Sequence, residues 1–333
     1  AVPWLWNTFF HVDNINEISI GAVRPDGTEK LEAKVSYDFG RFLPRIRDVF
    51  QERELEEVVV VFPYSNDFSS RKLAFDATNK VIRVLSYELN SHCRGIGEYQ
   101  LEELGIAPPK LILVPSPHNL ANKAFNTLVE HVETYGGIML ITGPISLDEY
   151  WNKTDRAATW LNPTEIVNVL REESIQIGEQ QYPVGFGGNR IAEVNKEQMK
   201  EAMGKIPELK EIPVGQGSLL WCSLPLELND RLEPLVALYH YALQKANVSA
   251  DMEWMQGGDN PGIFGKKLAF KQGSLFIFIS EYGYDAAVEV RDPANKAHYQ
   301  FKLETERTVI FATDAKGEIL EVYRPEEVQI YRS

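Results

Sequence analysis

Two apolar runs, Leu111-Ile112-Leu113-Val114 and Ile138-Met139-Leu140-Ile141-Thr142, decide the fold of the central part of this chain. Continuous apolar runs of this kind are typical of strands that are buried on both faces of a parallel sheet. The segment between them, Leu120 to Thr134, predicts a helix, and Gly136-Gly137 follows it where glycine favours a helix stop. The pattern therefore predicts a strand, a helix and a second strand of one sheet.

The same alternation of strand and helix extends outward from this centre. Glu57-Val58-Val59-Val60-Val61-Phe62 predicts a further buried strand, and Ser69 to Leu89 predicts a helix. Beyond the centre, we expect a strand at Gly217 to Leu224 and a helix at Asp230 to Ala246. This order predicts a flavodoxin-like, doubly wound α/β sheet over residues 37–247.

The pattern is less regular at two places within this part of the chain. Apolar residues from Tyr37 to Arg53 recur near helical spacing and predict a helix, in which Pro44 favours a kink or a later start. The stretch from Asp148 to Gln216 lacks such spacing. Its glycine-rich segment, Tyr182 to Gly188, indicates a loop region with a short hairpin.

From Val248 onward the apolar residues alternate with polar ones instead of following helical spacing. Turn signals occur at Gln272-Gly273, Asp292-Pro293 and Lys316-Gly317. The alternating runs predict strands at residues 267–270, 275–279, 287–290, 299–303 and 308–311. Strands that recur about every ten residues are typical of a small β-sandwich, which we expect over residues 248–333.

The chain opens with a short aromatic run, Ala1 to Phe10, that has no partner strand nearby in the sequence. It predicts one strand of a larger sheet, because an isolated buried strand leaves its edges unpaired. His11 to Lys34 is loop-like, with a turn at Pro25-Asp26-Gly27. The first residue is Ala1 rather than methionine, so we expect a chain that was processed or cut from a longer polypeptide.

Composition excludes several classes of partner and site. The formal net charge of −14 opposes binding to nucleic acid or to an anionic membrane, and no run of about 18 apolar residues could span one. The two cysteines, Cys93 and Cys222, are too few for a secreted disulfide scaffold, so we expect a cytoplasmic protein. The six histidines are scattered and no phosphate-binding glycine loop follows a strand, so we expect no metal and no cofactor.

The opening residues resemble the end of a (β/α)₈ glycosidase barrel, which we place at residues 1–36. The resemblance rests on Trp4-Leu5-Trp6-Asn7-Thr8 and on Arg24-Pro25-Asp26-Gly27-Thr28-Glu29-Lys30. In such barrels the eighth strand brings a tryptophan to the sugar site, at the strand's C-terminal end. The resemblance implies that Trp6 and Asn7 line that site, with Trp4 on the same side of the strand. The alternative is that both tryptophans belong to a core.

Residues Lys110 to Trp151 resemble the trimerisation domain of β-galactosidases, which is related to class I glutamine amidotransferases. The resemblance rests on the segments 109–117 and 136–144. A working amidotransferase has a nucleophilic cysteine on a tight strand-to-helix turn, and neither Cys93 nor Cys222 is expected on one. We therefore expect that this chemistry is lost, and an amidotransferase-like hydrolase using Cys93 stays as an alternative.

Two further motifs have a structural and a functional interpretation. Ser116 and His118 follow an expected strand end, where open α/β sheets bind ligands. The favoured interpretation is structural: a capped helix start at Asn119. Glu281 ends an apolar run before Tyr282-Gly283, as nucleophiles of barrel glycosidases often do. Alternating strands on both sides favour a hairpin there instead, and no second carboxyl group is nominated nearby.

The order of barrel end, amidotransferase-like domain and β-domain resembles the C-terminal part of a family-42 glycoside hydrolase. The resemblance implies a retaining enzyme that acts on β-glycosides, with both catalytic glutamates in the barrel upstream of Ala1 and none in this chain. It implies as partners a carbohydrate substrate, the missing barrel of the same polypeptide and further copies in a homo-oligomer. The alternative from another class is a stand-alone, non-catalytic carbohydrate-binding or oligomerisation module.

Overall fold

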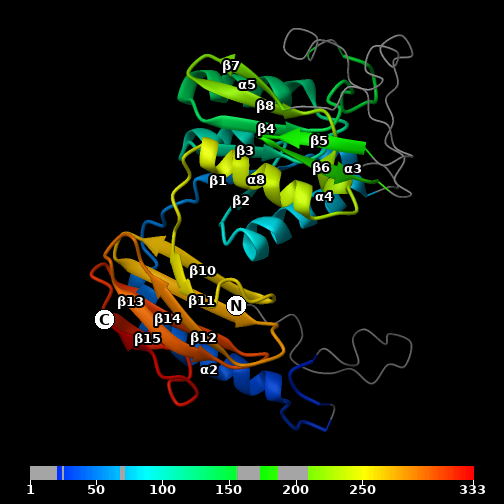
Figure 1. Cartoon of the computed structure of the whole chain (residues 1–333). Helices are drawn as coiled ribbons and strands as arrows, with labels where there is room; N and C mark the ends of the chain where they lie inside the picture. The colour runs from blue at the N-terminus through cyan, green and yellow to red at the C-terminus, as the bar shows by residue number, and fades with distance from the viewer. Residues whose placement is uncertain (1–20, 25, 68–71, 155, 157–172, 187–208) are drawn as a thin grey trace. The chain divides into compact units, whose positions relative to one another are not determined.

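The computed structural model describes residues 21–24, 26–67, 72–154, 156, 173–186 and 209–333, which form two compact units (Figure 1). The first, called the α/β unit here, comprises Leu55–Asp251. The second, called the β unit, combines the described residues up to Glu54 with Met252–Ser333. The α/β unit is therefore inserted in the sequence between the two parts of the β unit.

A mixed sheet forms the centre of the α/β unit. Its strands are β1 (Val58–Phe62), β2 (Arg94–Gly97), β3 (Leu111–Val114), β4 (Ile138–Thr142), β7 (Lys210–Val214) and β8 (Gly217–Cys222). They lie in the order β2-β1-β3-β4-β8-β7. Pairing is parallel from β2 to β8, whereas β7 pairs antiparallel with β8.

Helices and a hairpin accompany this sheet. The helical segments are α3 (Tyr64–Asp67), α4 (Leu73–Arg83) with the π-helical turn η2 (Val84–Glu88), η3 (Leu101–Gly105), α5 (Asn122–Tyr135), η4 (Leu226–Leu228) and α8 (Glu233–Lys245). The hairpin consists of β5 (Glu173–Ile177) and β6 (Gln180–Val184).

Both faces of the sheet are buried, which explains the continuous apolar runs. In β1, Val58 and Val60 pack in one core with α4, α8 and the β5–β6 hairpin. Val59 and Val61 pack in a second core with η3 and α5. Because successive side chains of a strand point to opposite faces, a strand covered on both sides must be apolar throughout.

Glycine ends the helix between the two deciding strands. Gly136 and Gly137 follow α5 directly, and both have a positive φ, of 81° and 83°. A Cβ on Gly137 would lie 3.0 Å from the carbonyl oxygens of Pro109 and Lys110. The glycine pair therefore lets the chain turn closely past the start of β3 before β4 begins.

The β unit contains two antiparallel four-stranded sheets. One has the order β10-β11-β14-β15 and the other β16-β13-β12-β9. Their bounds are β9 (Glu253–Gln256), β10 (Ile263–Phe270), β11 (Gly273–Ser280), β12 (Ala286–Arg291), β13 (His298–Leu303), β14 (Thr308–Asp314), β15 (Ile319–Val322) and β16 (Tyr331–Arg332). Phe276, Phe311, Val288 and Phe301 belong to one core that both sheets share.

A helix covers the other face of the first sheet. It is α2 (Leu31–Arg45), followed by the 3₁₀ turn η1 (Arg47–Val49). Phe42 and Ile46 pack with Leu275 and Ala312, while Phe276 and Phe278 of the same β11 strand face the shared core. The β unit thus has three layers: helix, sheet and sheet.

The expected mixture of an α/β part and antiparallel sheets is confirmed, with differences in detail. From residue 57 onward, strands occur at each of the expected positions, and α8 and α5 occupy the expected helical segments, whereas the strand expected at Ala1 to Phe10 lies outside the described residues. The helix expected at Tyr37 to Arg53 instead begins at Leu31 and ends at Arg45, with Pro44 accommodated in its last turn. The division of the chain also differs from the expected boundary at residue 37, because this helix packs on the β unit.

Candidate functional site

The residues expected to line a sugar site, Trp4, Trp6 and Asn7, lie outside the described residues. The described structure resumes shortly before the Arg-x-Asp-Gly-Thr stretch. There Gly27, with a φ of 83°, donates its N–H to the Arg24 carbonyl at 2.9 Å. Asp26 Oδ1 accepts the Thr28 hydroxyl at 2.7 Å, and this contact holds the pKa of Asp26 below its ordinary value. The stretch is therefore a closed turn that leads directly into α2.

The edge of the α/β sheet at which β1, β3, β4 and β8 end, called the carboxyl edge here, is where such sheets usually bind ligands (Figure 1). Ser116 lies there, two residues beyond β3, with a φ of 42°. A non-glycine residue in this left-handed region is uncommon and strained. Asn66 Nδ2 donates to the Ser116 carbonyl at 3.1 Å, and Ser116 N–H donates to Thr142 Oγ1 at 2.8 Å. The turn is thus held by α3 and by the end of the neighbouring strand β4.

A buried carboxyl group closes this turn. Glu227 Oε2 accepts the hydroxyls of Ser116 and Thr142, each at 2.5 Å, and its Oε1 accepts the Tyr239 hydroxyl at 2.6 Å. Glu227 is 2% exposed, and burial raises its pKa against the opposing effect of those hydrogen bonds. Burial and the nearby Glu227 charge also raise the pKa of Tyr239 well above its ordinary value.

The geometry argues against Ser116 as a nucleophile. The Ser116 hydroxyl donates a hydrogen bond to the buried Glu227 carboxyl group, and Ser116 is only 2% exposed. A serine nucleophile needs a base that takes its proton and an open path to substrate. The four side chains of Ser116, Thr142, Glu227 and Tyr239, called the Glu227 cluster here, instead join three strand ends to α8.

A second internal carboxylate occupies the neighbouring part of the carboxyl edge. Glu98, which follows β2 and is 3% exposed, accepts the Ser65 N–H at 2.7 Å and the Ala121 N–H at 2.9 Å. Ser65 lies in α3, and Ala121 is the N-cap residue of α5. Helix N-termini attract anions. The place where a sheet of this kind would hold an anionic ligand is therefore filled by the protein's own carboxylate.

This arrangement corrects the expected helix start. Asn119 does not cap α5, which begins at Asn122. The Asn119 side chain instead donates to the Asp148 carbonyl at 3.2 Å, and the helix end is satisfied by Glu98 from a different strand. The prediction of a capped helix at Asn119 was wrong because the capping group is distant in the sequence.

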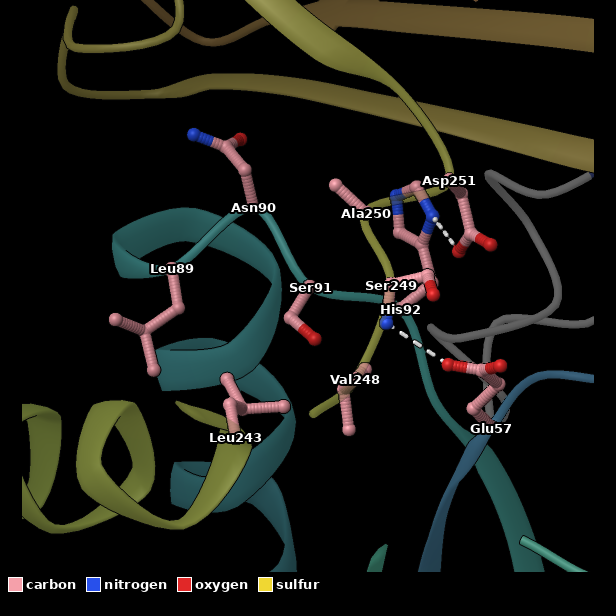
Figure 2. Close-up of a pocket in the computed structure, with 10 residues that line it drawn as sticks. All are labelled: Glu57, Leu89, Asn90, Ser91, His92, Leu243, Val248, Ser249, Ala250 and Asp251. Atoms are coloured by element: carbon pink, nitrogen blue, oxygen red, sulfur yellow. Dashed lines mark hydrogen bonds and ion pairs between the residues drawn. The ribbon is translucent and has the colours of Figure 1, made fainter. Parts of the chain in front are cut away.

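A small cavity of about 130 Å³ lies at the opposite edge, where the parallel strands begin, and Figure 2 shows the residues that line it. His92 Nδ1 lies 2.9 Å from Asp251 Oδ2, and Glu57 accepts the Ser249 N–H at 2.8 Å. The His92 side chain is 3% exposed. These contacts fix the segment 248–251, with which the chain leaves the α/β unit.

Cys93 lies at this same edge, directly before β2; it is half-buried and forms no disulfide. It therefore does not occupy a strand-to-helix turn at the carboxyl edge, which is where an amidotransferase nucleophile would be expected. Cys222 ends β8 and is buried, and burial raises the pKa of its thiol. Cys222 therefore lacks the environment of a reactive thiolate.

The remaining motifs have structural settings. Glu281 follows β11, whose neighbours β10 and β14 are both antiparallel, and its side chain is exposed. The hairpin expected there is not formed, because the next strand, β12, belongs to the other sheet. Across the described residues, no group of three or more His, Cys, Asp or Glu side chains could hold a metal ion. Nor does any helix in that part of the chain have the length and apolar character needed to cross a membrane.

Glu227 and Glu98 were missed in the sequence, although one of them left a signal there. Glu227 is a single acidic residue within Leu224-Pro225-Leu226-Glu227-Leu228. A carboxyl group in such an apolar run is expected to be buried with partners. Its partners Ser116 and Thr142 are too distant in sequence to be identified by spacing.

Comparison with known proteins shows a likeness of fold without a likeness of sequence. No family model matches the chain, and no curated protein matches it. Several solved structures, in contrast, match the fold of this chain. Gan42B, a GH42 beta-galactosidase from G. stearothermophilus, is 12% identical with a TM-score of 0.66, over 93% of this chain and 48% of that one.

Two further structures agree with this likeness. The beta-galactosidase from Bacillus circulans sp. alkalophilus is 13% identical with a TM-score of 0.68, over 93% of this chain and 49% of that one. The beta-galactosidase from Rahnella sp. R3 is 12% identical with a TM-score of 0.63, over 93% of this chain and 48% of that one. The expected resemblance is confirmed at the level of fold, and the chain spans about half the length of these enzymes.

Proposed function

We propose that this chain is the C-terminal portion of a retaining glycoside hydrolase that acts on β-glycosides, with the catalytic glutamates upstream of Ala1. One observation carries the proposal: nearly the whole chain matches the fold of several beta-galactosidases, yet it accounts for only about half of each. The half that is unmatched is long enough for most of a (β/α)₈ barrel, which typically has about 250 residues.

Within that frame we assign separate roles to the parts of the chain. Residues 1–36 would complete the barrel, with Trp6, Asn7 and Trp4 in one wall of the sugar site. The α/β unit would be a doubly wound, amidotransferase-like domain that has kept the fold without the chemistry. Glu98 and Glu227 support this assignment, because they occupy from within the edge at which such a sheet would bind a ligand.

We also propose that the α/β unit serves assembly into a homo-oligomer. Phe75 and Ile82 on α4 are 54% and 44% exposed, and their spacing of seven residues places them on one face of the helix. Exposed apolar side chains gathered on one face are typical of protein–protein contacts. A second copy of this chain is the partner that the proposal requires.

The test of the enzymatic proposal compares two polypeptides. The 333-residue chain alone and the native polypeptide that contains it are assayed with a nitrophenyl β-galactoside. We expect hydrolysis with retained configuration from the longer polypeptide and no rate above the blank from the chain alone, because retaining hydrolysis needs two carboxyl groups about 5 Å apart.

Two outcomes would contradict the proposal. Hydrolysis by the 333-residue chain alone would place the catalytic pair within it. A native polypeptide that starts at or just before Ala1 would leave the chain without a barrel, and the stand-alone binding or oligomerisation module would become the better account.

A further inference from the structure

The two edge strands of the α/β sheet differ in character. At one end, β7 carries Lys210, Glu211 and Pro213, and charged residues and proline on an edge strand oppose its pairing with another strand. At the other end, β2 has no proline, and among the described residues only β1 pairs with it. The outer side of β2, called the β2 edge here, therefore lacks this protection.

Two glycines present their backbone at the β2 edge. The Glu98 N–H donates to the Phe62 carbonyl at 3.1 Å, so the backbone of Glu98 is turned toward β1. Because successive residues of a strand direct their backbone groups to opposite sides, Gly95 and Gly97 are turned away from β1. Gly95 is exposed, and a Cβ at this position would meet nothing within 4 Å. The backbone at Gly95 is thus accessible to a further strand.

The position of α4 relative to the sheet follows from its contact with η4. Glu227 of η4 contacts Ser116 and Thr142, so η4 covers the ends of β3 and β4 in the middle of the sheet. Lys80 of α4 donates to the Asn229 carbonyl directly after η4. The Lys80 side of α4 therefore faces the middle of the sheet. Figure 1 shows α4 and η2, in cyan, at the β2 end of this sheet.

An exposed apolar surface accompanies the β2 edge. Phe75 and Ile82 lie about 140–160° around α4 from Lys80, since each residue of a helix turns the direction by about 100°. They are therefore on the side of the helix that is turned away from η4 and toward the β2 edge. Both side chains are exposed, so an apolar surface and an open strand edge lie next to each other.

A second copy of this chain fits the β2 edge in an antiparallel register centred on Ile96. Gly95 then pairs with Gly97 of the partner subunit, and each such pair exchanges both backbone hydrogen bonds. The Gly97 carbonyl accepts the Gln100 N–H at 2.9 Å and retains a second lone pair for this purpose. Arg94 lies opposite Glu98 of the partner subunit, so opposite charges face each other at both ends of the pairing.

The same symmetry brings the apolar surfaces together. A twofold axis through such a pairing is perpendicular to the sheet, so each face of one sheet continues into the same face of the other. The two α4 helices then flank the junction on one face, with Phe75 and Ile82 on their β2 sides. The two Ile96 side chains meet on the other face, where Ile96 packs with the core that contains α5. Strand pairing and apolar burial thus favour the same partner in the same orientation.

We propose that the α/β units of two copies of this chain associate through their β2 edges, so that the two sheets become one continuous sheet with the exposed sides of α4 beside the junction. The inference rests on the proposed assembly into a homo-oligomer, and it adds the surface, the orientation and the register of that contact.

Gly95→Pro tests the strand pairing. The N–H that proline removes points away from β1, so the change costs no hydrogen bond to β1 and blocks the contact. We expect light scattering to give twice the mass of 37.8 kDa for the unmodified chain and that mass itself for Gly95→Pro. Gly95→Ala is the matched control. It keeps the N–H, its methyl group has open space, and it should assemble as the unmodified chain does.

A cysteine at the centre of the pairing tests the register without blocking the edge. In Ile96→Cys the two thiols would face each other at a Cα separation of about 4.5 Å, which a disulfide can span. Oxidation should give a covalent dimer on a non-reducing gel. Ile212→Cys is the control, because Ile212 is half-buried against the same core but lies on β7, and it should give none. Both variants carry Cys93→Ser to remove the thiol beside β2.

Two results would overturn the inference and leave the assembly proposal intact. One is a Gly95→Pro chain that keeps the mass of the unmodified assembly while Phe75→Glu with Ile82→Glu loses it, since the contact would then not use β2. The other is the absence of a covalent Ile96→Cys dimer where the unmodified chain has the dimer mass, since the register would then be wrong. A single-chain mass for the unmodified protein would contradict the assembly itself, and the inference with it.

Discussion

Glu227 is the residue on which the closed carboxyl edge depends. It is buried, and it accepts hydroxyls from Ser116, Thr142 and Tyr239. Without it, three buried hydroxyl groups would have to find other acceptors. We expect Glu227→Ala to lower the free energy of unfolding of the α/β unit by about 1–3 kcal/mol.

The pH dependence of stability identifies the protonation state of this group. Because burial raises the pKa of Glu227, its contribution is fully present below its unfolded pKa, about 4.3, and is lost as the pH rises through the folded pKa. Glu227→Gln cannot ionise. The unfolding free energy of the unmodified chain should therefore fall relative to that of Glu227→Gln as the pH rises from about 4.3 toward the raised folded pKa of Glu227.

Urea unfolding at several pH values measures this difference. Glu130→Gln, which changes an exposed carboxylate on α5, is the matched control and should show no comparable trend. A difference between Glu227→Gln and the unmodified chain that stays constant with pH would show that Glu227 titrates alike in the folded and unfolded states.

At the scale of elements, the packing of α2 on the β unit can be tested directly. Phe42 is 4% exposed, and its ring lies 5.8 Å from that of Tyr323 in an edge contact. We expect Phe42→Ala to destabilise the β unit by about 3–5 kcal/mol and to leave the α/β unit unaffected. Hydrogen exchange should accelerate in the β11 peptide 273–280 and stay unchanged in the β4 peptide 138–142.

Val35→Ala on the exposed side of the same helix is the control for this experiment, because Val35 is 47% exposed. If Phe42→Ala instead accelerated exchange in β4 and had no effect in β11, α2 would belong to the α/β unit, as the sequence predicted by starting that domain at residue 37.

An element could be predicted from the sequence where its own residues determine it, and not where distant residues do. The runs in β1, β3 and β4 were predictable because burial on both faces demands apolar residues throughout. The strand β2, Arg94–Gly97, was missed because it is an edge strand with two glycines, whose pairing with β1 and not its composition makes it a strand. The assignment of α2 failed for the same reason, since its partners lie beyond residue 251.

The candidate site was less predictable than the fold. Ser116 stood out as a polar residue after a strand, but its acceptor Glu227 is 111 residues away. The other internal carboxylate, Glu98, is likewise distant in the sequence from Ser65 and Ala121, whose N–H groups it accepts.

At the scale of the whole molecule, the proposed assembly gives the prediction. The chain has a mass of 37.8 kDa, and we expect light scattering to report a small multiple of it. Phe75→Glu with Ile82→Glu should shift the mass to that of one chain, because two charges would be buried in the contact. Leu320→Glu, at an exposed apolar residue of the β unit, should leave it unchanged. A single-chain mass for the unmodified protein would end the assembly proposal.

The insertion of the α/β unit between Glu54 and Met252 also sets the order of events on the ribosome. The apolar face of α2 is synthesised early, but Leu275, Ala312 and Tyr323, on which it packs, emerge only after the whole inserted unit. At about 5–20 residues per second, that is a delay of about 10–40 seconds. By the end of this time the α/β unit has all of its own residues and can fold, whereas Phe42 and Ile46 of α2 still lack their partners and are exposed to chaperones and to neighbouring nascent chains.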